Sequence, residues 1–235
     1  MDWSGQTVVT AIYAVPELDT TICQCLSSVA IEFRGDVRVA AFDRVTDVTL
    51  RHAVAHGFAP RVYESGEPPR LREILHDAVR DCKTEYLWTI EHDCIVHPGT
   101  RRATHAHMRA HKDAAGIDCM TVDRKGQPNY PNGRKPLTDI PGEKYLKACK
   151  CNLSLNCVCW RAEALRAIEW EHVAQFPACD QTISNAIRRD GWQLCIATDV
   201  QCTHLFTGAR RWLPPERRYS KKYSHGIKPE LRGQP

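Results

Sequence analysis

Residues 84–100 read TEYLWTIEHDCIVHPGT, and this stretch decides the fold. Residues 85–90 are apolar almost without interruption, which is typical of a strand covered on both faces of a sheet. The strand then ends on two carboxylates, Glu91 and Asp93, with His92 between them. Because ligands of open α/β sheets bind beyond the carboxyl ends of the strands, the pattern predicts a ligand site at this edge.

Strand and helix patterns alternate three times before this stretch. The strand patterns cover residues 7–15, 36–43 and 61–65, and helical patterns follow over residues 18–33, 46–57 and 68–82. Such alternation indicates βαβ units, so we predict an α/β fold with a mostly parallel sheet flanked by helices. Asp43 falls at the end of the second strand, on the same edge as Glu91 and Asp93.

The second half of the chain is less regular. We expect a strand over 114–123, extended structure over 147–160, helices over 161–168 and 180–191, and one or two closing strands over 192–206. Residues 124–143 are rich in Pro, Gly and Asn and are predicted to be a long loop, which in a compact domain is usually functional or disordered.

The length and composition of the sequence indicate a globular chain of one domain with a basic tail. Of 235 residues, 43% are hydrophobic and 26% are charged, and no apolar run is long enough to span a membrane. The N-terminus has an acid where a signal peptide carries positive charge, so we predict a cytoplasmic protein whose twelve cysteines are reduced. We place the domain at 1–205 and the tail at 206–235.

The tail, residues 206–235, contains eight Lys or Arg and two Glu, interleaved with Trp212, Tyr219 and Tyr223. Aromatic rings among cations can stack on bases and contact phosphates, so a nucleic-acid partner is one interpretation. The tail is equally compatible with a lid over a diphosphate, a membrane contact or a solvated, partly disordered segment.

Glu91 and Asp93 are candidate ligands of a divalent cation. Carboxylate oxygens suit Mg²⁺ or Mn²⁺, and Mg²⁺ often takes one or two protein carboxylates together with substrate phosphates. Most acid-x-Asp pairs are solvated turn residues, but this pair follows an apolar strand and precedes HPGT, where Pro98 can open a helix.

Five segments in order resemble the GT-A glycosyltransferases, especially glycosyltransferase family 2. The strand with acid-x-Asp and Pro-Gly-Thr is similar to the D-x-D segment of that family. The other similar segments are VVTAIYAVPELDTTICQCLSSV at the start, VRVAAFDRVTDVT, ACDQTISNAIRRDGW and DVQCTHLF. The resemblance covers roughly residues 7–206 and implies a GT-A-like, Rossmann-like domain. The chain departs from the pattern at Glu91, at Arg44, and in lacking the Q/R-x-x-R-W acceptor motif.

The resemblance implies a role for each matching residue in binding a nucleotide-sugar. Asp43 would hydrogen-bond the base, in a pocket lined by Ala14, Val15 and Pro16. At the strand end, His92 would belong to the donor site, and Glu91 would contact the ribose or a metal-bound water, or ligate the metal itself.

By the same resemblance, Asp93 and His204 would ligate a Mn²⁺ or Mg²⁺ cofactor that neutralises the diphosphate. The alternative for His204 is a core histidine at a strand end. Thr46 and Asp47 favour a helix cap over a ligand contact.

Asp180 is the candidate catalytic base. Inverting glycosyl transfer needs one carboxylate to take the proton of the acceptor hydroxyl, and a metal to stabilise the leaving phosphate. An acid distant in sequence from Glu91 and Asp93 fits that division of roles. The alternative is that Asp180 only caps the N-terminus of its helix.

Cysteine and histidine clusters offer a second metal interpretation. CKC (149–151) and CVC (157–159) give paired thiols, but zinc sites usually separate such pairs by two to four residues. Cysteines at i and i+2 of a strand share a face, so packing as small apolar side chains is favoured. His107 and His111 lie one helical turn apart, and we expect them on an exposed helix face.

The predicted function is transfer of a sugar, with inversion, from a nucleoside-diphosphate-sugar (preferably a UDP-sugar) to a hydroxyl acceptor. A hydroxymethylated base in phage DNA, a saccharide or a lipid remain open as acceptors.

Two other classes of function stay open. A silent nucleotide- or nucleic-acid-binding protein would show steep salt dependence and need no divalent ion. A nucleotidyltransferase would carry a Gly-rich, basic loop after the first strand, which AVPELDTT is not.

Overall fold

The computed structural model describes residues 6–11, 19–33, 37–42, 45–63, 71–128, 137–175 and 178–205. Its strands are β1 (Gln6–Ala11), β2 (Val37–Phe42), β3 (Ala59–Tyr63), β4 (Tyr86–Glu91), β5 (Cys94–Val96), β6 (Ala114–Val122), β7 (Leu137–Asp139), β8 (Leu146–Cys149), β9 (Cys157–Arg161) and β10 (Gln193–His204). Its helices are α1 (Asp19–Glu32), α2 (Asp47–Ala55), α3 (Leu71–Asp81), α4 (Thr100–Ala110), α5 (Ala162–Arg166) and α6 (Cys179–Arg189), with a 3₁₀ turn η2 (Trp170–His172).

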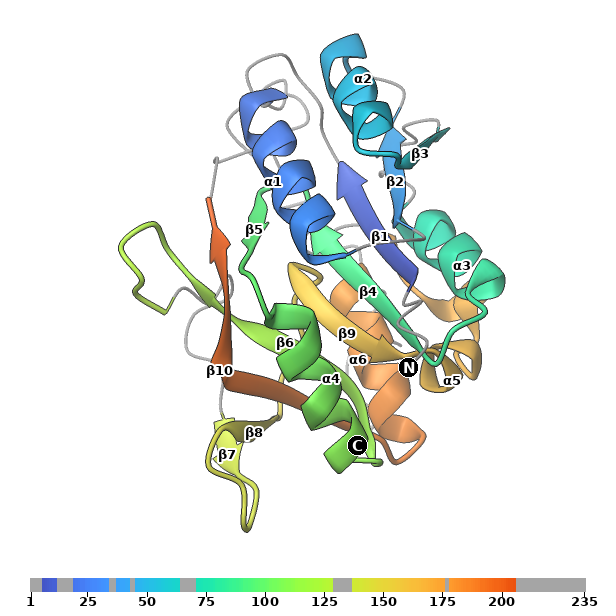
Figure 1. Ribbon diagram of the computed structural model, residues 1–235. Helices are drawn as coiled ribbons and strands as arrows, with labels where there is room; N and C mark the ends of the chain where they lie inside the picture. The colour runs from blue at the N-terminus through green and yellow to red at the C-terminus, as the bar shows by residue number, and fades with distance from the viewer. Residues whose placement is uncertain are drawn as a thin grey trace, which may run out of the picture.

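The ten strands form one sheet (Figure 1) in the order β3-β2-β1-β4-β9-β6-β10-β8-β7, with β5 paired to β10. The first four strands of this order are all parallel, and α1, α2 and α3 follow β1, β2 and β3 in the chain. The predicted βαβ alternation is therefore confirmed, and the chain is an α/β protein. α2 also begins as predicted, because Thr46 is its N-cap and accepts a hydrogen bond from the Thr49 amide.

The other half of the sheet is mixed, which corrects the prediction of a mostly parallel sheet. β9 is antiparallel to both β4 and β6, and β10 is parallel to β6 but antiparallel to β5 and β8. Parallel neighbours need a long crossover connection, and no helix occurs among the described residues between β6 and β9. The strands of that segment therefore pair antiparallel.

In this half one local prediction needs correction, one is confirmed in its single-strand form, and one short strand was not predicted. The loop predicted over 124–143 includes the short strand β7, while residues 129–136 lie outside the described part. β10 is a single strand whose register with β6 shifts between Ala197 and Gln201. β5, only three residues long, was not predicted at all.

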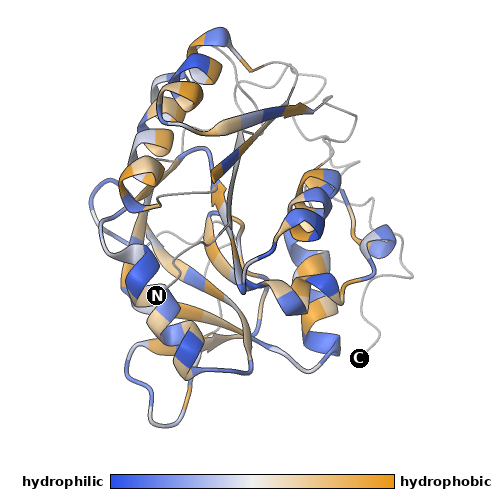
Figure 2. Cartoon of the chain, turned by 45° about the vertical axis from the view of Figure 1, so that its right-hand side comes forward, coloured by the Kyte–Doolittle hydropathy of each residue, from blue (hydrophilic) through white to orange (hydrophobic). Residues whose placement is uncertain are grey.

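Each face of the sheet carries its own hydrophobic core. α1, α2 and α4 supply residues to one core, and α3, α5 and α6 to the other. Figure 2 shows the helices as separate groups on the two sides of the strands, with orange hydrophobic residues on their inner surfaces. In β9, Cys157 and Cys159 face the first core while Val158 and Trp160 face the second, so this C-x-C pair packs as predicted.

The sheet brings the end of β4 to the middle of the molecule. All five residues of β4 before Glu91 are buried, as the apolar pattern predicted, and a two-residue turn then leads into β5. Since β1 and β9 flank β4 on either side, its carboxyl end opens between the parallel half and the mixed half of the sheet. None of the described helices is long and apolar enough to cross a membrane.

Candidate active site

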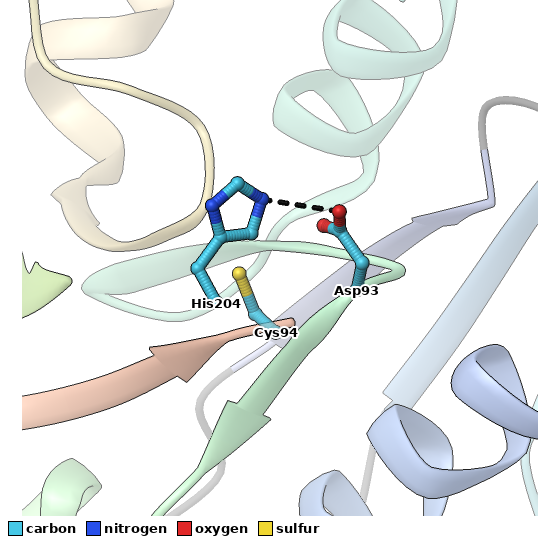
Figure 3. A group of neighbouring side chains, drawn as sticks. All are labelled: Asp93, Cys94 and His204. Carbon is cyan, nitrogen blue, oxygen red and sulfur yellow. Dashed lines mark hydrogen bonds and ion pairs between the residues drawn. The ribbon is translucent and has the colours of Figure 1, made fainter. Parts of the chain in front are cut away.

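The pairing of β5 with β10 joins Asp93 to His204, residues more than one hundred positions apart in the chain. His204 is directly opposite Cys94 in this antiparallel pair. The backbone amide of Leu205 donates to the carbonyl oxygen of Asp93 at 2.8 Å, which fixes the turn against the end of β10. The two side chains then meet, with His204 Nε2 3.1 Å from Asp93 Oδ2 (Figure 3).

Asp93 and His204 are buried and stabilise each other's charged forms. Burial alone would raise the pKa of Asp93, but the hydrogen bond from His204 and the positive charges of His92 and His204 outweigh it and lower the pKa. Burial would lower the pKa of His204, yet its hydrogen bond and charge attraction to Asp93 raise it. The pair therefore favours an ionised carboxylate at this point of the fold.

Asp93, Cys94 and His204 are the one group of three His, Cys, Asp or Glu side chains, among the residues that the structure describes, whose ligand atoms lie close enough to hold a metal ion (Figure 3). The second oxygen of Asp93, Oδ1, is buried and has no hydrogen-bond partner within the described ranges. Burial, together with a hydrogen bond involving Cys202, raises the pKa of the Cys94 thiol well above its usual value, which keeps this sulfur protonated. The carboxylate oxygens of Asp93 suit Mn²⁺ or Mg²⁺, whereas a protonated thiol suits neither ion.

Glu91 ends β4 beside this pair and is only partly exposed. Burial raises its pKa to about 8, and the negative charge of Asp93 adds to the effect, followed by smaller contributions from Asp180 and Asp118. A carboxyl under such repulsion gains from a nearby cation. The negative charges of Asp93, Asp118 and Asp180 all act on Glu91, although these acids come from the turn after β4, from β6 and from α6.

Asp118 is an acid of this region that the sequence analysis missed. It lies in β6, is 1% exposed, and accepts a hydrogen bond from Ser154 Oγ at 2.9 Å. Asp118 lies opposite Val158 of β9, and the backbone amide of Glu91 donates to the Asn156 carbonyl at 3.0 Å. Because side chains alternate between the two faces along a strand, Glu91, Asp118 and Asn156 belong to the sheet face that α6 covers. The sequence signal that could have identified Asp118 is the presence of an acid inside an otherwise apolar predicted strand.

Asp180 lies in the first turn of α6, held by two hydrogen bonds. Asn152 Nδ2 donates to its Oδ2 at 2.5 Å and the Gln181 amide to its Oδ1 at 2.8 Å. The N-cap of α6 is Ala178, so the alternative that Asp180 caps this helix is wrong. Asn152, Ser154 and Asn156 alternate with buried leucines between β8 and β9, a polar alternation in CNLSLNC that the sequence analysis did not use.

The structure does not test most of the remaining residues that were predicted to contact the donor. Ala14, Val15, Pro16 and Asp43 lie outside them, as does the basic tail, 206–235. The side chain of His92 is buried, 5% exposed, in the turn beside Asp93. Its contact with a donor stays a prediction.

The histidines of α4 are paired with acids instead of standing on an exposed face. His107 Nε2 is 3.0 Å from Asp199 Oδ1, and His111 Nε2 is 3.1 Å from Glu143 Oε1. The expectation that they are exposed is therefore wrong, because β10 and the residues before β8 pack against this helix. At the CKC pair, Cys149 Sγ and Cys151 Sγ are 3.4 Å apart, and none of the twelve cysteines, all of them within the described residues, forms a disulfide.

This mixed sheet, with acids at the carboxyl end of β4, is the GT-A fold. The solved structures that it matches include GalNAc-T7 with UDP, GalNAc and Mn²⁺, at a TM-score of 0.64 and 11% identity over 86% of this chain and 43% of that one. S. aureus TarS residues 1–349 match at a TM-score of 0.56 and 15% identity, over 88% of this chain and 64% of that one. A complex of the same TarS segment with UDP-GlcNAc matches at 0.55 and 16%, covering 85% of this chain and 58% of that one.

Similarity at 11–16% identity establishes the fold of the chain. The chain spans less than half of GalNAc-T7 and less than two thirds of the TarS segment. No protein-family model and no curated protein sequence matches it.

Proposed function

We propose that the protein is a metal-dependent glycosyltransferase that moves a sugar from a nucleoside-diphosphate-sugar to a hydroxyl acceptor. The observation that carries the proposal is the convergence of Glu91, Asp93 and His204 with Asp180 at the carboxyl end of β4 in a GT-A fold. The similar structures bound to UDP or UDP-GlcNAc favour a UDP-sugar as the donor.

In this proposal Asp93 and His204 hold a Mn²⁺ or Mg²⁺ ion, with Glu91 as a further ligand or a contact to the ribose. The ion supplies positive charge that stabilises the departing diphosphate. The Asp93–His204 contact keeps the carboxylate ionised and oriented, and the buried Oδ1 of Asp93 is available to a cation. Ala14, Val15, Pro16, Asp43 and His92 remain the proposed donor contacts.

Asp180 is the proposed base. Its carboxylate takes the proton of the attacking acceptor hydroxyl while the bond between the sugar and the diphosphate breaks, which gives inversion at the anomeric carbon. The two hydrogen bonds from Asn152 and the Gln181 amide hold the carboxylate in one orientation, as positioning for in-line attack requires.

The acceptor is proposed only as a hydroxyl compound, with a hydroxymethylated base in DNA, a saccharide and a lipid as candidates. The basic composition of residues 206–235 supports a nucleic acid among them. We retain domain limits of 1–205 and 206–235 and a cytoplasmic location, the latter because none of the described cysteines forms a disulfide.

The test combines donor binding with product analysis in two variants. Thermal-shift titrations of UDP, UDP-GlcNAc and UDP-GalNAc with and without Mn²⁺ should show metal-dependent stabilisation of the wild type. Asp93→Ala should lose that dependence. Asp180→Asn should bind the donor normally and lose at least about a hundredfold in transfer or donor hydrolysis, because only the base is removed.

Two results would contradict the proposal. Asp180→Asn with normal transfer would remove Asp180 from the role of base. Absence of any metal-dependent nucleotide binding, with steeply salt-dependent binding to DNA or RNA, would favour the silent binding protein. Release of pyrophosphate from a nucleoside triphosphate would favour a nucleotidyltransferase.

A further inference from the structure

A second group of candidate ligands lies between α1 and α2, which run side by side in the upper part of Figure 1. Ser27 comes from α1, while His52 and His56 come from the last turn and the C-cap of α2. Ser27 Oγ is 3.0 Å from His52 Nε2 and 3.3 Å from His56 Nε2. The two Nε2 atoms are 3.2 Å apart.

The helix explains why both rings reach one point. Residues four apart lie on the same face of an α-helix, one turn above the other. His52 and His56 have ring centroids 4.7 Å apart and ring planes inclined by 75°, so the rings meet at an angle and are not stacked. Both direct the same nitrogen, Nε2, toward Ser27 on the neighbouring helix.

Ser27 Oγ, His52 Nε2 and His56 Nε2 form a nearly equilateral triangle, and its sides match the distances between ligand atoms around a bound metal ion. For a tetrahedral ion with metal–nitrogen bonds of about 2.0–2.1 Å, neighbouring ligand atoms are about 3.3 Å apart. The measured separations of 3.0, 3.2 and 3.3 Å lie close to that value. We propose that His52 and His56, with Ser27 as a weaker third ligand, bind a late first-row divalent transition-metal ion such as Zn²⁺.

The chemistry of the ligands distinguishes this site from the acid centre, as we call the group of Glu91, Asp93, Asp118, Asp180 and His204 at the end of β4. Imidazole nitrogen suits Zn²⁺, Ni²⁺ or Cu²⁺, whereas the carboxylate-rich region around Asp93 suits Mg²⁺ or Mn²⁺. A groove lined by Asp19, Cys23, Ser27 and His52 gives the ion access from solvent. His56 is exposed, so water can complete the coordination.

The rival explanation is a hydrogen-bonded cluster without metal. His52 Nε2 is also 3.1 Å from the Cys23 carbonyl, so a protonated Nε2 can donate there while Ser27 donates to His56. Such an arrangement satisfies these groups but needs one ring to be a donor and the other an acceptor. Metal binding would require Nε2 of both rings to be deprotonated. A metal site therefore predicts measurable affinity for a transition metal, whereas a hydrogen-bonded cluster predicts none.

An ion at this site would clamp the two helices at a second point. The other end of the pair is already joined, because Asp19 Oδ1 accepts hydrogen bonds from Thr46 Oγ1 at 2.5 Å and Thr49 Oγ1 at 2.9 Å. Metal bound only by the folded chain raises stability by mass action. The site shares no residue with the acid centre, so it is independent of the proposed glycosyl transfer.

The experiment is a Co²⁺ titration of the full chain, kept reduced, followed by optical absorption and by competition with Zn²⁺. Co²⁺ bound by imidazole gives ligand-field bands without the thiolate charge-transfer band that cysteine ligands produce. We expect the wild type to bind Co²⁺ without that charge-transfer band. The affinity for Co²⁺ should be at least tenfold weaker in His56→Ala and in His52→Ala. His56→Ala changes an exposed residue just after the helix, so its fold should persist.

Two control variants separate the site from other histidines. His172→Ala removes an exposed histidine that contacts Glu169, and His204→Ala removes the acid centre's imidazole. Imidazole-type binding that is unchanged in His172→Ala, and that persists in His204→Ala with the same dependence on His52 and His56, would support the proposal. Equal affinity in wild type, His52→Ala and His56→Ala, or complete loss of binding in His204→Ala, would overturn it.

Discussion

The two halves of the sheet differ in construction and in what they give to the site. The parallel half, β3-β2-β1-β4, has exposed positions along its edge strand β3. The mixed half begins with β9, in which every residue is buried, and β6, which is almost entirely buried. Glu91 ends the last strand of the parallel half and Asp93 follows it, whereas Asp118, Asp180 and His204 come from the mixed half.

This difference indicates that the acid centre is assembled at the seam between the halves, where β4 pairs with β9. The parallel half can be built from successive local units, but the mixed half depends on contacts between distant segments. Buried polar side chains such as Arg161 and Asp118 provide some of those contacts. Substitutions in the mixed half should therefore affect stability and the site more than equivalent ones in the parallel half.

The largest expected effect is that of Arg161→Ala. The Arg161 guanidinium is buried and donates to the carbonyls of Ala114, Met108 and His111 and to Glu85 Oε1, at 2.9–3.3 Å. Its removal leaves three carbonyl oxygens without this donor. We expect a loss of about 3–5 kcal/mol in the free energy of unfolding, measured by urea denaturation.

Arg38→Ala is the matched control in the parallel half. Arg38 also pairs with an acid from a neighbouring helix, Asp81 at 2.8 Å, but both side chains are about one third exposed. Exposed ion pairs contribute little, so we expect a loss below about 1 kcal/mol. If the two variants were equally destabilised, the proposed contrast between the halves would be wrong.

The next effect is a pH dependence from His105 in α4. Its Nε2 accepts a hydrogen bond from Trp88 Nε1 at 3.1 Å, and burial, with the charges of Arg101 and Arg109, lowers its pKa to about 4. The unfolded value is about 6.5. The folded state therefore favours the neutral ring, and stability falls as the pH drops from about 6.5 to about 4.

The loss assigned to His105 should be about 2–3 kcal/mol across that window. The measurement is urea denaturation at several pH values for the wild type and for His105→Gln, whose amide does not titrate. The difference between the two curves isolates His105 from the carboxylates that titrate nearby. Parallel curves from pH 7 to pH 4 would contradict the predicted shift.

The smallest expected effect tests Asn152 as a positioning residue for Asp180. Asn152→Ala removes the hydrogen bond to Asp180 Oδ2 but leaves the carboxylate itself. If Asp180 is the base, kcat should fall about tenfold, equivalent to about 1.4 kcal/mol, while donor KM stays unchanged. A merely structural role would instead lower the melting temperature and leave kcat of the folded enzyme intact.

The parallel half was predictable because its signals are local. A helix start at Thr46, an apolar run ending at Glu91 and regular alternation of strand and helix can each be recognised within a few residues. The turn at Gly191 after α6 is equally local, and its positive φ of 83° suits glycine. The same local signals singled out Glu91 and Asp93 as candidates, whereas Asp180 was chosen mainly through the resemblance to glycosyltransferase family 2.

The mixed half was less predictable because its strands are short and their partners are distant. Nothing near β5 in the sequence indicates that its three residues pair with Cys202–His204. The insertion of β9 between β4 and β6 likewise depends on tertiary packing, and it is what brings Asn156 to Glu91 and Asp118 to Ser154. The sequence analysis could name His204, but not the contact that joins it to Asp93.

The hydrogen bond from the Leu205 amide to the Asp93 carbonyl has a consequence for residues 206–235. The basic segment is covalently tethered at the acid centre, because Leu205 is its attachment point. A molecule captured by that segment would be held near the proposed base at an effective concentration on the order of millimolar. Moving the same segment to the N-terminus would preserve its charge and remove this proximity.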